Sequence, residues 1–137
     1  MIYNIFYNSN REIGWTTDSE CPDYIVQDQL TQGLKHLTVD QSDLPIAENY
    51  YVNEAEDGIV LKSTFNPTFS TDTPILEATI NVTGLPLGTE VFVDGVSKGT
   101  MSSTTLNLVA TDPGSFTIKF KKFEYFEYEK KINVSRY

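Results

Sequence analysis

The side chains best suited to catalysis are the one histidine and the one cysteine of the chain, His36 and Cys21. A histidine serves as a general base or a metal ligand near neutral pH. A cysteine becomes a nucleophile when a base or a cationic group stands beside it. The sequence neighbours of Cys21 are Asp18, Glu20 and Asp23, which cannot activate a thiol. We therefore expect an ordinary polar histidine and an unreactive cysteine.

Acidic side chains gather at Glu54, Glu56 and Asp57, and their oxygens are the ligands that calcium prefers. Their spacing does not match that of a calcium-binding loop. Asp57 also forms, with Gly58, an Asp-Gly pair that is typical of a reversing turn. The cluster is interpreted as the solvated tip of a hairpin, and neither a metal nor a cofactor is expected.

A second pair of carboxylates, Asp94 and Asp112, has the chemistry that glycoside hydrolysis requires. Each of them stands in a predicted turn, Asp94 before Gly95 and Asp112 before Pro113 and Gly114. Turn chemistry is a sufficient reason for both residues. No nucleophile, base and orienting group can be assembled from a single histidine and a single cysteine, so the chain is not expected to be an enzyme.

These turns separate segments that read as strands. Asp94 and Gly95 divide residues 90–94 from residues 96–101, and an Asp-Gly pair between alternating residues is a strong hairpin signal. Pro113 and Gly114 precede residues 115–121, which alternate apolar and polar side chains. Further strands are expected at 75–83, 104–109 and 125–134. Turn signals at this spacing are typical of an antiparallel sandwich or barrel.

The N-terminal half is expected to be β-rich with at most a short helix. Strands are predicted at residues 1–7, 11–17, 36–39, 50–52 and 59–65, and a helix within residues 24–34. Ile13 and Trp15 are predicted to lie on one face of their strand, because side chains two residues apart share a face. Asp57 and Gly58 are predicted to reverse the chain between residues 50–52 and 59–65.

Charge divides the chain as well. The net charge is −9; residues 1–76 hold three basic and twelve acidic side chains, whereas residues 77–137 hold seven of each. Residues 67–74 are rich in Pro, Thr and Ser, which is typical of a linker. The predicted organisation is an acidic N-terminal module at 1–66, a linker at 67–74 and a β domain at 75–137.

The same composition excludes several kinds of partner. The acidic balance argues against direct binding of nucleic acid, because phosphate contacts need a basic face. No apolar run is long enough to suggest a membrane helix, so insertion into a membrane is not expected. A single cysteine leaves no internal disulfide, which fits a reducing compartment or a particle assembled in the cytosol.

Aromatic side chains provide the best candidates for binding. Strand alternation places Phe126 and Tyr128 on one face and leaves others on the opposite face. Exposed rings beside charges are typical of protein interfaces and of sugar-stacking platforms, and simple packing within the core or at a sheet edge is the third possibility. The candidates for an interface are Tyr50, Tyr51, Phe123 and Tyr125.

Two resemblances rest on these elements. Residues 84–134 resemble the small Ig-like and PEGA-type β domains, through GT at 88–89, VDG at 93–95, GT at 99–100 and PG at 113–114. Residues 101–103 (MSS) depart from the proline that PEGA repeats carry, which leaves the broader Ig-like resemblance. This resemblance implies a C-terminal Ig-like antiparallel β-sandwich in a mostly β chain.

The second resemblance covers residues 45–134. The segments YYV at 50–52, KSTFNP at 62–67 and INVTGLPLGTEVFVDG at 80–95 resemble a group of small tailed-bacteriophage virion proteins, which are tail or tail-fibre-associated structural proteins. The resemblance implies a non-enzymatic virion component, assembled in the host cytoplasm, that contacts other virion proteins and copies of itself. Two alternatives stay open: a module that binds a host surface glycan, and a tail-fibre assembly chaperone absent from the mature particle.

Overall fold

The computed structural model describes residues 1–137 and divides them into two compact units, unit 1 (Met1–Lys62) and unit 2 (Ser63–Tyr137). Strands account for 47% of the residues and helices for 9%. The prediction of a mostly β chain with a single short α-helix is therefore confirmed. No helix combines the length and the apolar character that a membrane span would need.

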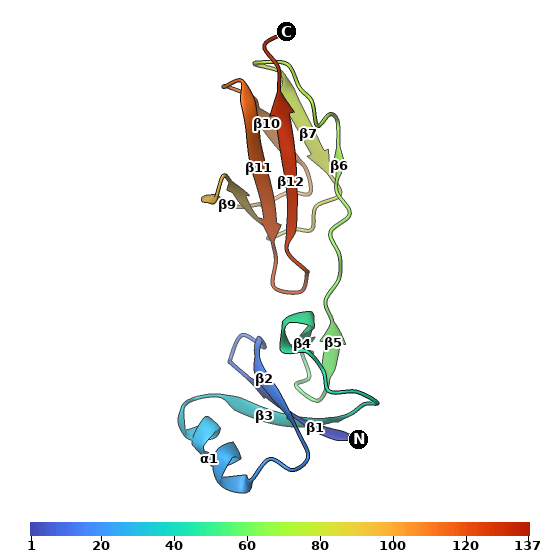
Figure 1. Cartoon of the computed structure of the whole chain (residues 1–137), viewed down its shortest axis with the longest axis vertical. Helices are drawn as coiled ribbons and strands as arrows, with labels where there is room; N and C mark the ends of the chain where they lie inside the picture. The colour runs from blue at the N-terminus through green and yellow to red at the C-terminus, as the bar shows by residue number, and fades with distance from the viewer. The chain divides into compact units, whose positions relative to one another are not determined.

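Unit 1 is built around its first strand. The elements are β1 (Ile2–Tyr7), β2 (Ile13–Asp18), α1 (Asp23–Thr31), β3 (Lys35–Asp40), the 3-10 helix η1 (Ala47–Asn49), β4 (Tyr50–Val52) and β5 (Ile59–Leu61). The order of the main sheet is β2-β1-β3, with both pairings antiparallel, and β4 and β5 form a separate hairpin (Figure 1). β1 is consequently the central strand of its sheet.

The two faces of β1 have different environments. Ile5 and Tyr7 point to one face, where they form a small core with Leu37 of β3 and Val52 of β4. Phe6 points to the other face and is fully buried. The Trp15 indole lies over Phe6, and its Nε1 donates to Oε1 of Gln29 on α1 at 3.0 Å. This bond ties the helix to that face of the sheet.

The position of Trp15 corrects one prediction. Phe6 is opposite Trp15 and Tyr7 is opposite Ile13, so the register shifts by one residue at Gly14. A bulge of this kind reverses the alternation of side chains along the strand. Ile13 therefore packs against the core on the Tyr7 face, and Trp15 stacks on Phe6 on the opposite face.

The loop at residues 53–58 also differs from the predicted turn. The residue with a left-handed backbone is Glu56, with φ of 56°, rather than Gly58. The Asn53 side chain closes the loop, because its Oδ1 accepts the amide N–H of Asp57 at 3.1 Å and that of Gly58 at 3.3 Å. The reversal is therefore longer than an Asp-Gly turn and depends on Asn53.

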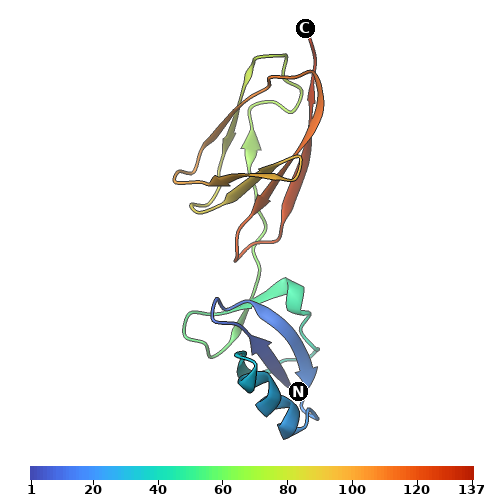
Figure 2. The same ribbon diagram turned by 90° about the vertical axis from the view of Figure 1, so that its left-hand side faces the viewer.

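Unit 2 consists of two antiparallel sheets. Its strands are β6 (Thr68–Phe69), β7 (Thr79–Thr83), β8 (Glu90–Val93), β9 (Val96–Thr100), β10 (Leu106–Val109), β11 (Gly114–Lys121) and β12 (Tyr128–Val134). One sheet has the order β10-β7-β6 and the other the order β12-β11-β8-β9. The two layers are visible in Figure 2, and unit 2 is sandwich-like.

Both sheets contribute to one core in unit 2. Ile80 and Val82 of β7 are fully buried, as are Ile118 and Phe120 of β11. Phe120 lies at the centre of an aromatic group, with ring centroids 5.6 Å from Tyr128, 6.0 Å from Phe65 and 6.3 Å from Phe69. The alternation predicted for residues 115–121 corresponds to this buried face.

The segment predicted as a linker, residues 67–74, belongs to unit 2. Phe65 is part of its core, and Thr68 and Phe69 form β6 by pairing with β7. Further along, the carbonyl of Asp72 accepts the amide N–H of Asn133 at 3.1 Å, so the segment follows the edge of β12. Proline lacks an amide donor and is tolerated at such edges. The Pro- and Thr-rich composition therefore belongs to a sheet edge here. The boundary between the two compact units falls between Lys62 and Ser63 in the sequence.

Candidate functional site

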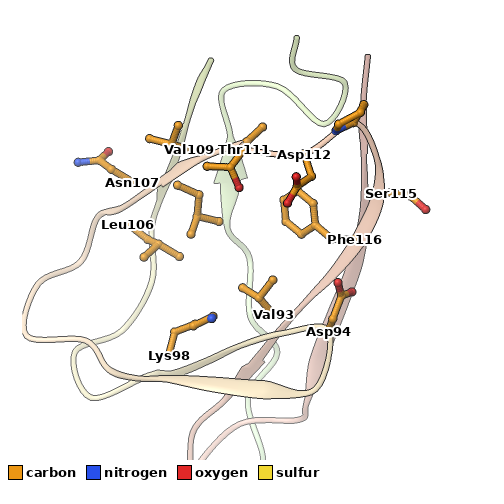
Figure 3. Close-up of a pocket in the computed structure, with 13 residues that line it drawn as sticks. Val93, Asp94, Lys98, Leu106, Asn107, Val109, Thr111, Asp112, Ser115 and Phe116 are labelled. Atoms are coloured by element: carbon orange, nitrogen blue, oxygen red, sulfur yellow. The ribbon is translucent and has the colours of Figure 1, made fainter. Parts of the chain in front are cut away.

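A groove of about 590 Å³ opens on one side of unit 2. Strand β10 lies along one side, the β8–β9 hairpin along the other, and the start of β11 closes one end (Figure 3). β10 is the last strand of one sheet and β9 is the last strand of the other. The groove therefore runs between two sheet edges, each with a neighbouring strand on only one side.

The lining of the groove is mainly apolar. Leu106 and Leu108 of β10 and Phe116 of β11 pack against the core of unit 2, yet each is only half-buried. Val93 of β8 adds a further half-buried apolar side chain. Side chains that point between two sheets are normally covered by the facing sheet. The groove thus leaves one side of the core open to solvent.

The backbone of β10 also has unused hydrogen-bonding groups. The amide N–H of Ala110 donates to the carbonyl of Ala78 at 3.2 Å, on the β7 side. Because these groups alternate along an antiparallel strand, those of Leu106 and Leu108 also point towards β7. The amide and carbonyl groups of Asn107 and Val109 then point away from β7, along the free edge.

Charged side chains lie at both ends of the groove. Figure 3 shows Lys98 of β9 nearer to Leu106, while Asp94 and Asp112 lie towards Phe116. Asp94 and Gly95 form the β8–β9 turn, with φ of 50° and 81°, as a primed two-residue turn requires. Oδ1 of Asp94 also accepts the amide N–H of Thr117 at 2.9 Å, which fixes this carboxylate beside β11.

The turn before β11 is the other one that sequence patterns indicated. Gly114 has φ of 114°, a conformation that a side chain would strain, and it begins β11 opposite Val134. Pro113 lines the groove beside Asp112. The carboxylates interpreted as turn residues are therefore brought to one groove, which the sequence analysis did not anticipate. No local sequence pattern signals this grouping, because it depends on the order of the strands in the two sheets.

The four aromatic candidates for an interface are divided between the two units, with Tyr50 and Tyr51 in unit 1 and Phe123 and Tyr125 in unit 2. Tyr50 and Tyr51 are half-buried on β4, where Tyr50 is opposite Leu61 and Tyr51 bridges to Glu12. In unit 2, Phe123 and Tyr125 are half-buried as well.

Tyr125 has a structural contact of its own. Its ring centroid lies 4.8 Å from that of Phe65, and its backbone forms a parallel bridge with Ser63. Packing against the core therefore accounts for part of this side chain, and the use of its exposed part in binding stays a prediction.

A second hollow, of about 570 Å³, lies beside β6 and β12. The rings of Phe69 and Tyr128 line it and stack at 6.3 Å. Nζ of Lys130 lies 5.1 Å from the Phe69 ring centroid and 3.7 Å from Oδ2 of Asp72. The ammonium group occupies the ring face that a sugar would need, so this hollow adds nothing to the prediction of glycan binding.

His36 and Cys21 belong to unit 1, whereas the groove is lined by residues of unit 2. Nε2 of His36 lies 2.7 Å from Oδ1 of Asn4, and its ring stacks on Phe6 with centroids 5.0 Å apart. Sγ of Cys21 lies 3.9 Å from the carbonyl of Pro22. No group of three or more His, Cys, Asp or Glu residues is arranged to hold a metal ion.

The environment of His36 predicts that unit 1 is less stable in mild acid. Burial lowers the pKa of His36, so as the pH falls below about 6.5 the unfolded chain takes up a proton more readily than the folded chain. The free energy of unfolding should therefore decrease between about pH 7.5 and pH 5.5. Urea unfolding followed by Trp15 fluorescence measures this change.

The control for this experiment is His36→Gln, which keeps a donor for Oδ1 of Asn4 but does not titrate. His36 is the one histidine of the chain, so the variant should lose most of the pH dependence in this range. An equal pH dependence in both proteins would contradict the prediction.

The fold defines the class of protein as a β-rich chain with a groove in a sandwich-like unit. In comparisons with known proteins, no family model matched the chain, and neither a curated protein nor a solved structure did. The functional conclusion therefore depends on the geometry and on the residues that provide it.

Proposed function

We propose that this chain is a non-enzymatic structural protein that acts by binding other proteins. The observation that carries the proposal is the groove of unit 2, where half-buried Leu106, Leu108 and Phe116 lie beside a free strand edge. Apolar side chains and unpaired backbone groups in one place are suited to contact with another polypeptide. Nothing in such an arrangement makes or breaks a bond.

The specific form of the proposal is a bacteriophage virion protein, in the tail or a tail appendage. It rests on the resemblance of residues 45–134 to small tailed-phage structural proteins. Partners would be other virion proteins and copies of the chain itself, as repeated assemblies require. The chain would be localised in the virion after assembly in the host cytoplasm.

Sheet topology supports an Ig-like assignment for unit 2 within this proposal. The order β10-β7-β6 corresponds to strands E, B and A of an immunoglobulin-type sandwich, and β12-β11-β8-β9 corresponds to G, F, C and C′. No strand occupies the position of D beside β10. Ig-like sandwiches occur in many proteins that bind others, and a fold alone does not identify the partner.

Unit 1 supplies the second surface in the proposal. Residues 1–62 hold three basic and eleven acidic side chains, so the unit carries a large negative charge. One ion pair joins Lys35 to Glu56 at 2.8 Å and lowers the pKa of the Glu56 carboxyl. An acidic unit of this kind is suited to docking on a basic surface of a neighbouring protein, in a contact that weakens with salt.

Quantitative mass spectrometry and labelled-particle imaging test the proposal. Particles purified from cells that produce the chain should contain it at a fixed copy number and at one position. Detection in infected cells but never in purified particles would contradict a virion role and favour the assembly chaperone. A capsid protein of known copy number, measured in the same sample, is the control for recovery.

A further inference from the structure

The groove of unit 2 has the geometry of a sheet from which one strand is missing. β10 has β7 on one side and no strand on the other, and β9 is likewise unpaired on its outer side. We infer that an extended segment of a partner protein binds here by pairing with the free edge of β10. This inference rests on the proposed function and names the chemistry of the partner.

Backbone groups supply the first part of the argument. The amide and carbonyl groups of Asn107 and Val109 point away from β7, because those of Ala110 point towards it. An added strand satisfies these groups with its own backbone, as in other cases of strand addition. An antiparallel partner is expected, since antiparallel pairing is the more stable arrangement.

Apolar contacts supply the second part. Leu106 and Leu108 alternate along β10 on its inner face, and Phe116 and Val93 complete the lining. A strand beside β10 directs every second side chain into the same space. The partner segment should therefore carry apolar residues at alternate positions, which complete the burial of these half-buried side chains.

Charge sets the direction of the partner. A strand antiparallel to β10 begins near Asp112 and ends near Lys98, because β10 runs from the Lys98 end towards Asp112 (Figure 3). A basic residue at the start of the segment would meet Asp94 and Asp112, and an acidic residue at its end would meet Lys98. The groove should therefore favour a segment with a basic start and an acidic end over a segment with the two charges exchanged.

The chain's own neighbouring segment cannot fill this position. The connection from β9 to β10 spans only residues 101–105, and it is fixed at one end by the Met101 amide N–H, which donates to the Thr89 carbonyl at 2.8 Å. Within it, the amide N–H of Thr105 donates to Oγ of Ser103 at 3.2 Å. This connection is therefore not the occupant, and the proposal assigns the position to a segment of another protein.

The test uses a capped synthetic peptide of about seven residues, a typical strand length. The peptide alternates valine and threonine, begins with lysine and ends with glutamate. It should bind the full chain, and a peptide with the two charged ends exchanged should bind about tenfold more weakly. Hydrogen exchange measured by NMR should show new protection at the amides of Asn107 and Val109 in the complex.

Two variants of one residue separate backbone pairing from side-chain contact. Asn107→Pro removes the outward amide N–H and leaves the β7 side of the strand intact, so it should weaken peptide binding more than about tenfold. Asn107→Ala keeps the amide and should bind as the wild type does. Circular dichroism and thermal unfolding verify that both variants are folded.

A charge exchange provides a test that does not alter the backbone. The double variant Lys98→Glu with Asp112→Lys should prefer the peptide with exchanged ends. No binding at about 1 mM peptide, binding without protection of the two amides, or equal binding by Asn107→Pro would each overturn strand addition.

Two further outcomes identify what fails. The full chain could form dimers that the substitution Asn107→Pro abolishes. This result would assign the groove to a second copy of the chain and overturn the inference that a different protein binds there. The chain could also capture particle proteins equally well with and without the substitution Asn107→Pro. This result would overturn strand addition, while the proposed function would stand.

Discussion

Phe120→Ala is expected to destabilise unit 2 by about 3–5 kcal/mol, the range measured when a buried aromatic side chain is truncated. Phe120 is fully buried, and its ring contacts those of Phe65, Phe69 and Tyr128. These three side chains come from the segment before β6, from β6 and from β12. The substitution therefore opens a cavity in the core beside β6 and β12, each of which is the last strand of its sheet.

Urea unfolding followed by circular dichroism measures this loss. Phe116→Ala is the matched control, because Phe116 lies on the same strand but is half-buried at the groove. It removes the same atoms from a site that is already partly open, so its cost should be clearly smaller. Equal destabilisation by the two variants would contradict the position of Phe120 at the centre of the core.

Phe6→Ala should have a comparable effect on unit 1, about 3–5 kcal/mol. Phe6 is fully buried between the Trp15 ring, at 4.3 Å, and the His36 ring, at 5.0 Å. Because small domains are only marginally stable, a loss of this size should leave unit 1 largely unfolded at physiological temperature. Loss of α1 from the sheet is expected with it, since Gln29 is bonded to the displaced Trp15.

Fluorescence of Trp15 reports this change directly, because it is the one tryptophan of the chain. In Phe6→Ala its emission should shift towards that of the urea-unfolded chain. Tyr24→Ala is the control on α1, where Tyr24 is 72% exposed and its loss should cost less than about 0.5 kcal/mol. A native emission spectrum in Phe6→Ala would contradict the stacked arrangement.

Sequence patterns were sufficient for most strands, because local chemistry determines them. Residues 116–120 alternate, and their apolar members are those that pack in the core of unit 2. Asp94 and Gly95 occupy the positive-φ positions of the β8–β9 turn, and few residue pairs adopt this conformation without strain. The predicted helix and the structure's α1 overlap, although α1 ends before Gly33.

The predictions that failed depended on a single residue or on distant partners. One unpaired residue, Gly14, reversed the faces of Ile13 and Trp15, and alternation alone cannot reveal such a bulge. Residues 67–74 were taken as a linker because their composition resembles one, whereas β6 is fixed by pairing with β7.

Lys130 shows a related difficulty. Strand alternation assigns this residue to the same face as Tyr128 and Ile132, where a charged side chain is unexpected, and the β11–β12 register is continuous from Phe120 to Gly114. Its ammonium group instead lies over the Phe69 ring, so the side chain completes the apolar face with its stem. The sequence alone does not predict this arrangement, because the ring that Lys130 contacts belongs to a strand distant in the sequence.

The candidate site was beyond sequence reasoning for a topological reason. The groove exists because β9 and β10 end different sheets, and strand order cannot be read from alternation. Asp94 and Asp112 were each explained locally, as turn residues, and Lys98 had no predicted role. Their common location appears only when the two sheets are placed together.

The place of β1 in its sheet has a consequence for synthesis on the ribosome. β1 is made before the elements that cover it, since Phe6 is covered by Trp15 of β2, and Ile5 and Tyr7 pack with Leu37 of β3 and Val52 of β4. Until β4 has been made, part of this apolar surface stays exposed on the nascent chain. Unit 1 should thus be a client of ribosome-associated chaperones, and slow translation before residue 61 should favour its aggregation.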